Sequence, residues 1–321
     1  MASFRLKIER ALQARHVEFV HDPSQTADAI LLIAGSRHVL PLWRAKRRGV
    51  RLVQRLDGLN WVQRARWNGI RYEMRALYGN TIMNLYRRRL ASRVVYQSQF
   101  VRGWWDAWYG VAPVPTAVIL NGVDLVEYSP RPVNNPRRNA RRLLVVEGSL
   151  AGAQRDGLLH AVRLAEALNL RDPTEVVVAG TVDRSTRQLV VSTSRVPVQF
   201  LGVIAREQIP ELMRSADLLF SAEINPPCPN SVIEALGCGL PVVGFDTGSL
   251  NELVTGDAGR LAPYRGDPWK LETPELAPLV EAAEEVLMDP ARFRREARKR
   301  AEAGLGVEEM VDAYLKVLLE Q

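Results

Sequence analysis

The stretch Ala216–Val254, ADLLFSAEINPPCPNSVIEALGCGLPVVGFDTGSLNELV, decides the fold of the second half of this 321-residue chain. It predicts an apolar strand over Asp217–Ser221, a proline-rich turn, a helix that begins at Pro229–Asn230–Ser231, and a strand over Pro241–Phe245. Short apolar strands that alternate with helices are typical of a parallel sheet covered on both faces. We therefore expect a Rossmann-like domain here.

The same alternation extends along the rest of the chain. After residue 142, further strands are expected at Leu143–Glu147, Glu175–Ala179 and Val198–Leu201, and the tail from Thr273–Pro274 onward is expected to be mainly helical. The first half shows the pattern less clearly, with expected strands at Val17–Val20, Ala29–Ala34, Leu52–Leu56, Ser92–Gln97 and Ala117–Leu120. The Pro-, Asn- and Arg-rich segment 128–142 predicts a linker. We expect a first domain over 1–127 and a second over 143–321.

The composition limits the class of protein. Hydrophobic residues make up 47% and charged residues 25% of the chain, which excludes a disordered or collagen-like protein. The two cysteines, Cys228 and Cys238, are too few for a disulfide framework, and we expect both to be buried fillers. No apolar run is long enough for a membrane span and the amino terminus does not resemble a signal peptide, so we expect a cytoplasmic protein.

The two halves carry charge of opposite sign. Residues 1–130 hold 20 Lys/Arg against 9 Asp/Glu, a balance of +11, whereas residues 131–321 hold 23 against 27, a balance of −4. A basic half favours contact with phosphate or an anionic membrane surface, although a solvated arginine-rich surface explains it equally well. No nucleic-acid-binding motif is present, so we expect no nucleic-acid partner.

Residues 60–91 interleave aromatic side chains with seven arginines. We expect two helices separated at Gly79–Asn80, with the aromatic side in the core and the arginine side in solvent. A helix lying on a membrane surface is the alternative, and the arginines at 87–89 would then contact anionic lipid.

Three turns of the second domain are expected to meet at one edge of the sheet. The helix that begins near Asn230 presents unpaired N–H groups suited to a diphosphate or a sugar hydroxyl, and Glu234 lies one turn inside it. Ser231 and Glu234 also match a capping box, which needs no ligand. A second small-residue turn, residues 246–249, and a glycine loop at 148–152 followed by Arg155 complete the set.

These residues resemble the retaining GT-B glycosyltransferases of family four. The resemblance rests on Ala216–Val254, which is similar to the family's donor-binding signature, on Asn121–Asp124 with Pro130, and on Val95–Ser98. It implies an α/β fold of GT-B type, in which two Rossmann-like domains face each other across a cleft and terminal helices cross back to the first domain. It also implies transfer of a sugar from a nucleoside diphosphate sugar to an acceptor hydroxyl with retention, as in hexosyltransferases.

The family pattern assigns roles to residues of this chain. Asp57 is expected to act on the acceptor in the cleft and Arg155 to neutralise the departing diphosphate. The nucleotide sugar is the co-substrate, with no other cofactor and no metal, and the acceptor is a glycan or a lipid-linked molecule at the inner face of the membrane. The expected donor-binding residues are Ser149, Gly152, Gly202, Val203, Asn230, Ser231, Glu234, Thr247, Gly248 and Ser249.

The chain also departs from the family pattern. The first acid of the family's E-x7-E pair is replaced by Pro226, its diphosphate-binding arginine by Ser149, and its lysine by Gln154 or Asp156. Family members open with a strand and a Gly-Gly loop, whereas this sequence begins directly with a helix expected at Leu6–Leu12. Truncation of the amino terminus or a feature of a subfamily would explain this difference. A degenerate GT-B protein that binds a nucleotide sugar or a protein partner without turnover is therefore the alternative function.

Overall fold

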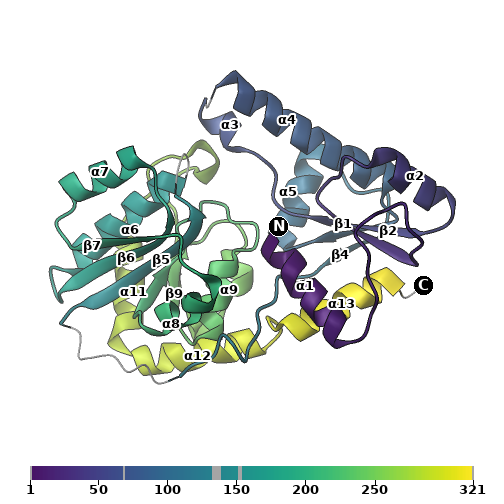
Figure 1. Cartoon of the computed structure of the whole chain (residues 1–321). Helices are drawn as coiled ribbons and strands as arrows, with labels where there is room; N and C mark the ends of the chain where they lie inside the picture. The colour runs from purple at the N-terminus through teal and green to yellow at the C-terminus, as the bar shows by residue number, and fades with distance from the viewer. Residues whose placement is uncertain (1, 68, 132–138, 151–153, 320–321) are drawn as a thin grey trace. The chain divides into compact units, whose positions relative to one another are not determined.

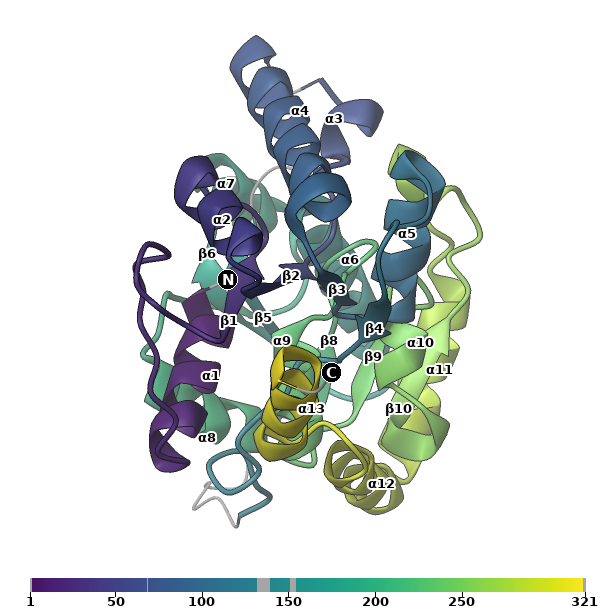
Figure 2. The same ribbon diagram turned by 90° about the vertical axis from the view of Figure 1, so that its right-hand side faces the viewer.

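The computed structural model describes residues 2–67, 69–131, 139–150 and 154–319. The chain divides into two compact units (Figures 1 and 2). Unit 1 is the chain up to Gly122 together with the segment from Leu305 onward, and unit 2 is Val123–Gly304. The division thus lies a few residues before the linker expected at 128–142, of which residues 132–138 are outside the described part.

Unit 1 contains a four-stranded parallel sheet in the order β1-β2-β3-β4. Its strands follow the apolar runs read from the sequence, shifted by one or two residues. Its elements are α1 (Ala2–Ala14), β1 (Ala29–Ile33), α2 (Val39–Arg47), β2 (Arg51–Leu56), α3 (Val62–Ala65), α4 (Ile70–Leu85), the π-helical turn η1 (Tyr86–Leu90), β3 (Arg93–Tyr96), α5 (Gln99–Tyr109), β4 (Thr116–Val118) and α13 (Val307–Leu319).

The last helix of the chain completes the core of unit 1. Met310, Val311 and Tyr314 of α13 pack against α1 and the sheet, and the rings of Phe4 and Tyr314 lie 5.1 Å apart. Figure 2 shows α1 and α13 on the same side of the sheet. This packing requires a glycine at position 122, because a Cβ atom there would lie 2.5 Å from the Gly306 carbonyl oxygen. Close backbone contact therefore joins the end of the chain to unit 1.

Two local predictions for unit 1 are wrong. Val17–Val20 forms no strand, because its side chains are only partly buried and no neighbouring strand pairs with it. Gly79–Asn80 does not break the helix either: α4 runs through both residues. The buried Asn80 side chain exchanges hydrogen bonds of 2.9–3.1 Å with the backbone and side chain of Asn60, and this tertiary contact offsets the low helix propensity of the pair.

The expectation that the aromatic side of residues 60–91 packs in the core is also wrong for most of that segment. Trp61 and Tyr86 are buried. Helix α4 extends away from the sheet of unit 1 (Figure 2), and a stripe of large apolar side chains along it is 48–67% exposed. The stripe consists of Ile70, Met74, Leu77, Tyr78 and Leu85.

Unit 2 contains a six-stranded parallel sheet in the order β10-β9-β8-β5-β6-β7, with helices on both faces (Figure 1). The strands read from the sequence are present and β10 is an addition. Its elements are β5 (Arg141–Ser149), α6 (Gln154–Leu168), β6 (Thr174–Thr181), α7 (Arg184–Thr193), β7 (Val198–Gly202), η2 (Arg206–Gln208), α8 (Ile209–Arg214), β8 (Leu218–Phe220), α9 (Asn230–Gly237), β9 (Val242–Phe245), α10 (Leu250–Leu253), η3 (Gly256–Ala258), β10 (Gly259–Ala262), η4 (Pro268–Lys270), α11 (Ala277–Met288) and α12 (Pro290–Glu302).

The strand order of unit 2 reverses between β5 and β8. From β5 the chain builds outward through β6 and β7, and it then returns to β8 and builds in the opposite direction through β9 and β10. The loops that follow β5 and β8 therefore leave the sheet in opposite directions. A crevice opens outside the carboxyl ends of strands at such a switch point, which is where ligands of doubly wound folds bind.

Gly157 allows α6 to approach this edge of the sheet. An added Cβ would lie 1.8 Å from the carbonyl oxygen of Ala222, which follows β8. Gly148, near the end of β5, has nothing within 4 Å of its ideal Cβ position. The close approach of α6 to β8 thus depends on Gly157 and not on Gly148.

We predict that Gly157→Ala destabilises the chain by about 3 kcal/mol, since overpacking at 1.8 Å outweighs the roughly 1 kcal/mol that alanine gains in helix propensity. Urea denaturation measures the change. Gly148→Ala is the control and should alter stability by less than about 0.5 kcal/mol. Equal stability of the two variants would contradict the packing described here.

Candidate functional site

Helix α9 begins at the carboxyl edge of the unit 2 sheet without a side-chain cap. Its N-cap residue is Pro229, whose ring offers no hydrogen-bond acceptor. Ser231 is the second helical residue and not the cap, so the capping box with Glu234 does not form. The first N–H groups of a helix have no intrahelical acceptors and carry a partial positive charge. The start of α9 is therefore suited to an anion or to sugar hydroxyls.

The polar side chains predicted on α9 lie where the sequence placed them. Asn230 is the first residue of the helix and is partly buried. Ser231 is 9% exposed and Glu234 is 8% exposed, one turn further along. A carboxylate that is this buried needs polar partners, and Glu234 interacts with other groups of the chain.

Pro226 and the turn after β9 are joined by their backbones. The Ser249 N–H donates to the Pro226 carbonyl oxygen at 2.9 Å, and the Asn225 N–H donates to the Thr247 hydroxyl oxygen at 3.4 Å. Gly248 has φ +62°, and a Cβ there would lie 2.4 Å from the Pro226 nitrogen. Ser249 is also fully buried, so its amide is engaged and cannot reach a diphosphate in this arrangement. The turn instead positions the Pro-rich loop that leads into α9.

Three buried polar groups near this edge have no hydrogen-bond partner among the described residues. They are the hydroxyl of Ser221, which directly follows β8, the side-chain NH2 group of Asn225 and the hydroxyl of Ser249. Each belongs to a residue that is at most 4% exposed. Buried polar groups are nearly always paired with protein, water or ligand. Three polar groups on neighbouring loops of this edge thus have hydrogen-bonding capacity that the described residues do not use.

The loop after β5 forms the other side of the switch point. Ser149 ends β5 and is exposed, and the expected Gly152 lies outside the described residues. Arg155 lies in the first turn of α6 and is partly buried, and its Nε has no partner among the described residues. Arg155 is therefore placed to offer a cation at this edge.

Two further residues expected to bind the donor, Gly202 and Val203, lie farther along the same edge. Gly202 ends β7, the outermost strand, with φ +69°, and nothing lies within 4 Å of its ideal Cβ position. Val203 follows it and is 79% exposed. Both are thus accessible from solvent.

A carboxylate pair that the sequence analysis did not identify lies at the switch point. Glu147 belongs to β5 and Glu223 follows the adjacent strand β8. Burial and the neighbouring Glu223 carboxylate raise the pKa of Glu147 well above its ordinary value, and burial raises the pKa of Glu223 to about 7. Two like charges so close do not ionise together easily, so the pair retains a proton near neutral pH.

In unit 1, Asp57 follows β2 as expected but is held by an arginine. Its carboxylate forms an ion pair with Arg55, which is 2% exposed. The Arg55 guanidinium also donates to the side-chain oxygens of Gln97 and Asn121, each at 2.9 Å. Gln97 and Asn121 belong to two of the segments that carry the family resemblance. They hold a buried cation that in turn orients Asp57.

Neither metal ligands nor reactive thiols are added by the remaining side chains. The described residues contain no group of three or more His, Cys, Asp or Glu side chains that could hold a metal ion. Cys228 and Cys238 are buried thiols outside any disulfide, as expected for fillers.

The carboxylate pair predicts a pH dependence of stability. Because the Glu223 pKa is about 7 in the folded protein and ordinarily 4.5, the native state binds more protons between these values, and stability falls as the pH rises through this window. We predict that Glu223→Gln shows a shallower fall, so that it is more stable than the wild type at pH 8 and similar at pH 4. Thermal unfolding across this range measures the difference. Glu211→Gln, at an exposed position of α8, is the control. A Glu223→Gln effect that is the same at both pH values would contradict the shared proton.

Comparisons with known proteins agree with this geometry. Residues 141–273 match the family model described as "Glycosyl transferases group 1". The chain is 27% identical over 220 residues to a GDP-mannose-dependent alpha-(1-6)-phosphatidylinositol dimannoside mannosyltransferase of Mycobacterium tuberculosis, a match that covers 65% of the chain and 53% of the relative. The chain thus spans about half the length of this curated relative.

Solved structures share the fold at low sequence identity. Sucrose-phosphate synthase from Thermosynechococcus elongatus superposes with a TM-score of 0.70 at 18% identity, over 97% of this chain and 76% of that one. Anabaena HepE in complex with UDP gives 0.68 at 20% identity, over 98% and 82%. The chain therefore has the GT-B fold, and its residues 141–273 are similar to a group 1 glycosyltransferase domain.

Proposed function

We propose that this chain is a retaining glycosyltransferase that transfers a sugar from a nucleoside diphosphate sugar to an acceptor hydroxyl without a metal ion. The observation that carries the proposal is the uncapped start of α9 at the switch point of unit 2, beside buried polar groups that lack partners. Such an edge can bind a diphosphate and sugar hydroxyls together. The matched glycosyltransferase domain supports the same function.

The proposed chemistry is the stabilisation of a leaving group. The bond between the anomeric carbon and the diphosphate oxygen breaks, and the electron pair leaves with the diphosphate. The acceptor oxygen then bonds to the anomeric carbon on the same face, and its proton passes to a phosphate oxygen. In our proposal the backbone N–H groups of α9 and the Arg155 guanidinium stabilise the negative charge of the departing diphosphate. Glu234 accepts hydrogen bonds from hydroxyl groups of the donor.

The relatives indicate which donors to test. The curated relative is named as GDP-mannose-dependent, and the solved neighbour HepE binds UDP and UDP-glucose. We propose a nucleoside diphosphate hexose as the donor and a glycan or lipid-linked molecule as the acceptor.

We predict that the purified chain releases nucleotide from GDP-mannose or UDP-glucose, and that chelation of divalent cations leaves the rate unchanged. Glu234→Gln should lower kcat/KM about 10- to 100-fold, because a hydrogen bond to a charged group is lost, and Arg155→Ala should lower it about 100-fold. Nucleotide release followed by chromatography measures both changes.

Glu211→Gln, remote from the switch point, should retain wild-type activity and controls for the loss of a carboxylate. A rise in melting temperature with a nucleotide sugar but no turnover would favour the alternative, a GT-B protein that binds without catalysis. Absence of both responses across the donor panel would overturn the proposed donor site.

We further propose that unit 1 binds an anionic membrane surface through α4. The stripe formed by Ile70, Met74, Leu77, Tyr78 and Leu85 is too exposed and too apolar for an ordinary soluble surface. Arg71 and Arg75 lie next to it on the same helix and are exposed. An apolar face beside basic residues fits the interface of an anionic bilayer. None of the described helices is long and apolar enough to cross a bilayer.

The arginines at 87–89 contribute less to this surface than the sequence indicates. Arg87 is fully buried, and its guanidinium donates to the Tyr96 hydroxyl, to Asp106 and to the Gly110 carbonyl oxygen, each at 2.7 Å. Arg88 and Arg89 remain exposed. Replacement of Arg87 would disturb the fold of unit 1, so the test belongs on α4.

We predict that Leu77→Asp weakens binding to anionic liposomes about tenfold. The substitution removes apolar surface that the bilayer would cover, and it adds a negative charge. Liposome co-sedimentation measures the partition. Leu170→Asp is the matched control, since Leu170 is 87% exposed in unit 2, and this variant should sediment like the wild type. Equal loss in both variants, or no binding by the wild type, would contradict the proposal.

A further inference from the structure

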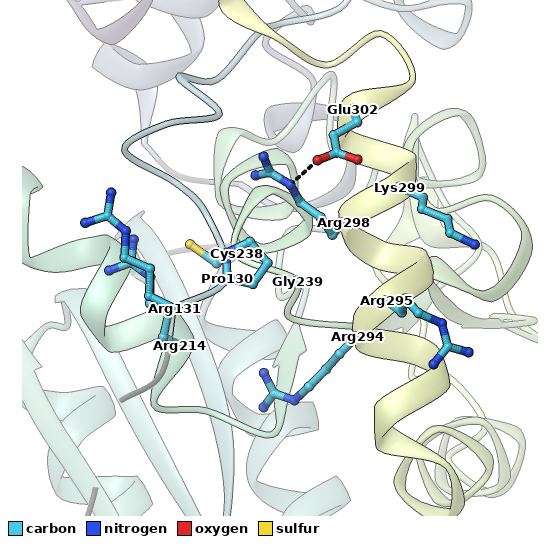
Figure 3. Close-up of a pocket in the computed structure, with 10 residues that line it drawn as sticks. All are labelled: Pro130, Arg131, Arg214, Cys238, Gly239, Arg294, Arg295, Arg298, Lys299 and Glu302. Atoms are coloured by element: carbon cyan, nitrogen blue, oxygen red, sulfur yellow. Dashed lines mark hydrogen bonds and ion pairs between the residues drawn. The ribbon is translucent and has the colours of Figure 1, made fainter. Parts of the chain in front are cut away.

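A basic cavity of about 590 Å³ lies in unit 2, away from the proposed donor site (Figure 3). The cavity lies between three parts of unit 2: Pro130 and Arg131, the residues that follow α9, and one side of α12. Its lining contains Cys238 and Gly239, which follow α9, and lies near Ala216, which precedes β8. The cavity is thus at the amino edge of β8 and β9, opposite the edge that carries the start of α9. The lining residues with cationic side chains are Arg131, Arg214, Arg294, Arg295, Arg298 and Lys299.

Three of these arginines hold one short piece of backbone. Arg214 donates to the carbonyl oxygens of residues 127 and 129, both at 2.6 Å. Arg298 donates to those of residues 125 and 128, at 3.1 and 2.8 Å. Arg131 donates to that of residue 126 at 3.2 Å. Five successive carbonyl groups thus accept from guanidinium groups that line the cavity.

Carbonyl dipoles fix these guanidinium groups but leave their formal charge. Neither Arg131 nor Arg214 forms an ion pair with a carboxylate among the residues that the structure describes. Glu302 is the acidic residue of the lining, and it pairs with Arg298 at 2.7 Å. Six cationic side chains and one carboxylate line the cavity, and Glu296, outside the lining, pairs with two of the cations, Arg295 and Lys299. The remaining excess of positive charge contrasts with the balance of −4 over residues 131–321. The positive charge of the cavity is therefore a local feature of an acidic half.

The remaining polar group of the lining adds no negative charge. Burial raises the pKa of the Cys238 thiol to about 12, so it stays protonated at neutral pH. Pro130 and Gly239 also line the cavity and carry no charge. The cations come from three separate segments, and Figure 3 shows Arg131 and Arg214 on the opposite side of the cavity from the α12 side chains. This arrangement suits a ligand that carries more than one anionic group.

We propose that this cavity is a second ligand site, which binds a small anion with two or more phosphate groups. Guanidinium groups that are already held in position lose little conformational freedom on binding, and their positive charge attracts phosphate oxygens, to which their remaining N–H groups can donate. The volume is in the range of cavities that enclose small-molecule ligands. The shared chemistry is a pair of neighbouring phosphates, whether on a soluble molecule or on a lipid headgroup. The proposal is independent of the donor site.

The test is a matched pair of charge reversals in the full chain. Lys299 lines the cavity, is 62% exposed and pairs with Glu296 three residues earlier. Lys270 lies elsewhere in unit 2, is 71% exposed and likewise pairs with an acid three residues earlier, Asp267. Isothermal titration calorimetry with inorganic pyrophosphate should show about tenfold weaker binding for Lys299→Glu and wild-type binding for Lys270→Glu.

Arg131→Glu tests the opposite side of the cavity and should weaken pyrophosphate binding in the same way. A second arm uses phosphatidylcholine vesicles that contain a phosphatidylinositol bisphosphate, in the Leu77→Asp background, which removes the binding proposed for α4. Loss of binding in either arm on both cavity reversals supports the site, and the arm that responds identifies the source of the phosphates. Because none of these positions belongs to the donor edge, pyrophosphate binding there cancels in the comparison. Equal binding by the wild type and both cavity variants in both arms would overturn the proposal.

Discussion

The reversal of strand order between β5 and β8 is the constraint on which the proposed site depends. Adjacent parallel strands whose crossovers run in opposite directions leave a crevice at their carboxyl ends that no helix fills. The groups that we assign to the donor lie in the first turns of helices that begin at this edge, Arg155 in α6 and Asn230 to Glu234 in α9. The close approach of α6 to β8 at Gly157 and the uncapped start of α9 then determine which amides and side chains face the crevice.

Where the chain departs from the family pattern, backbone contacts replace side-chain chemistry. Pro226 stands at the position of the first acid of the E-x7-E pair, and its carbonyl and ring fix the turn that contains Gly248 and Ser249. The loop is thereby built without the carboxylate that the pattern would place there. Glu147 and Glu223 bring two carboxyl groups to the same edge from other positions, and their shared proton limits the negative charge that a diphosphate would meet.

The sequence predicted the elements of unit 2 well because each strand is an apolar run covered on both faces, and periodicity reports such burial directly. It was less informative where tertiary contacts decide the outcome. Asn80 keeps α4 continuous through its bonds to Asn60, which lies twenty residues away, and no local signal reveals this. The exposure of the α4 stripe was missed for a related reason: an amphipathic pattern identifies an apolar face but not what covers it.

The candidate site was predictable to a similar extent. The position of Glu234 on α9 follows from the motif, whereas the pair formed by Glu147 and Glu223 and the bonds that Gln97 and Asn121 make to Arg55, the partner of Asp57, arise between neighbouring strands. The register of the parallel strands brings these side chains together, and the sequence of a single strand does not reveal its register with its neighbours. The guanidinium groups that line the basic cavity likewise come from three separate segments.

The most direct test of the account is a crystal structure of the chain with GDP or UDP bound. The account predicts that the diphosphate lies at the start of α9, with Arg155 within hydrogen-bond distance of its oxygens and Glu234 near the hydroxyl groups. A nucleotide bound elsewhere on the molecule, with the crevice between β5 and β8 filled by side chains, would contradict it.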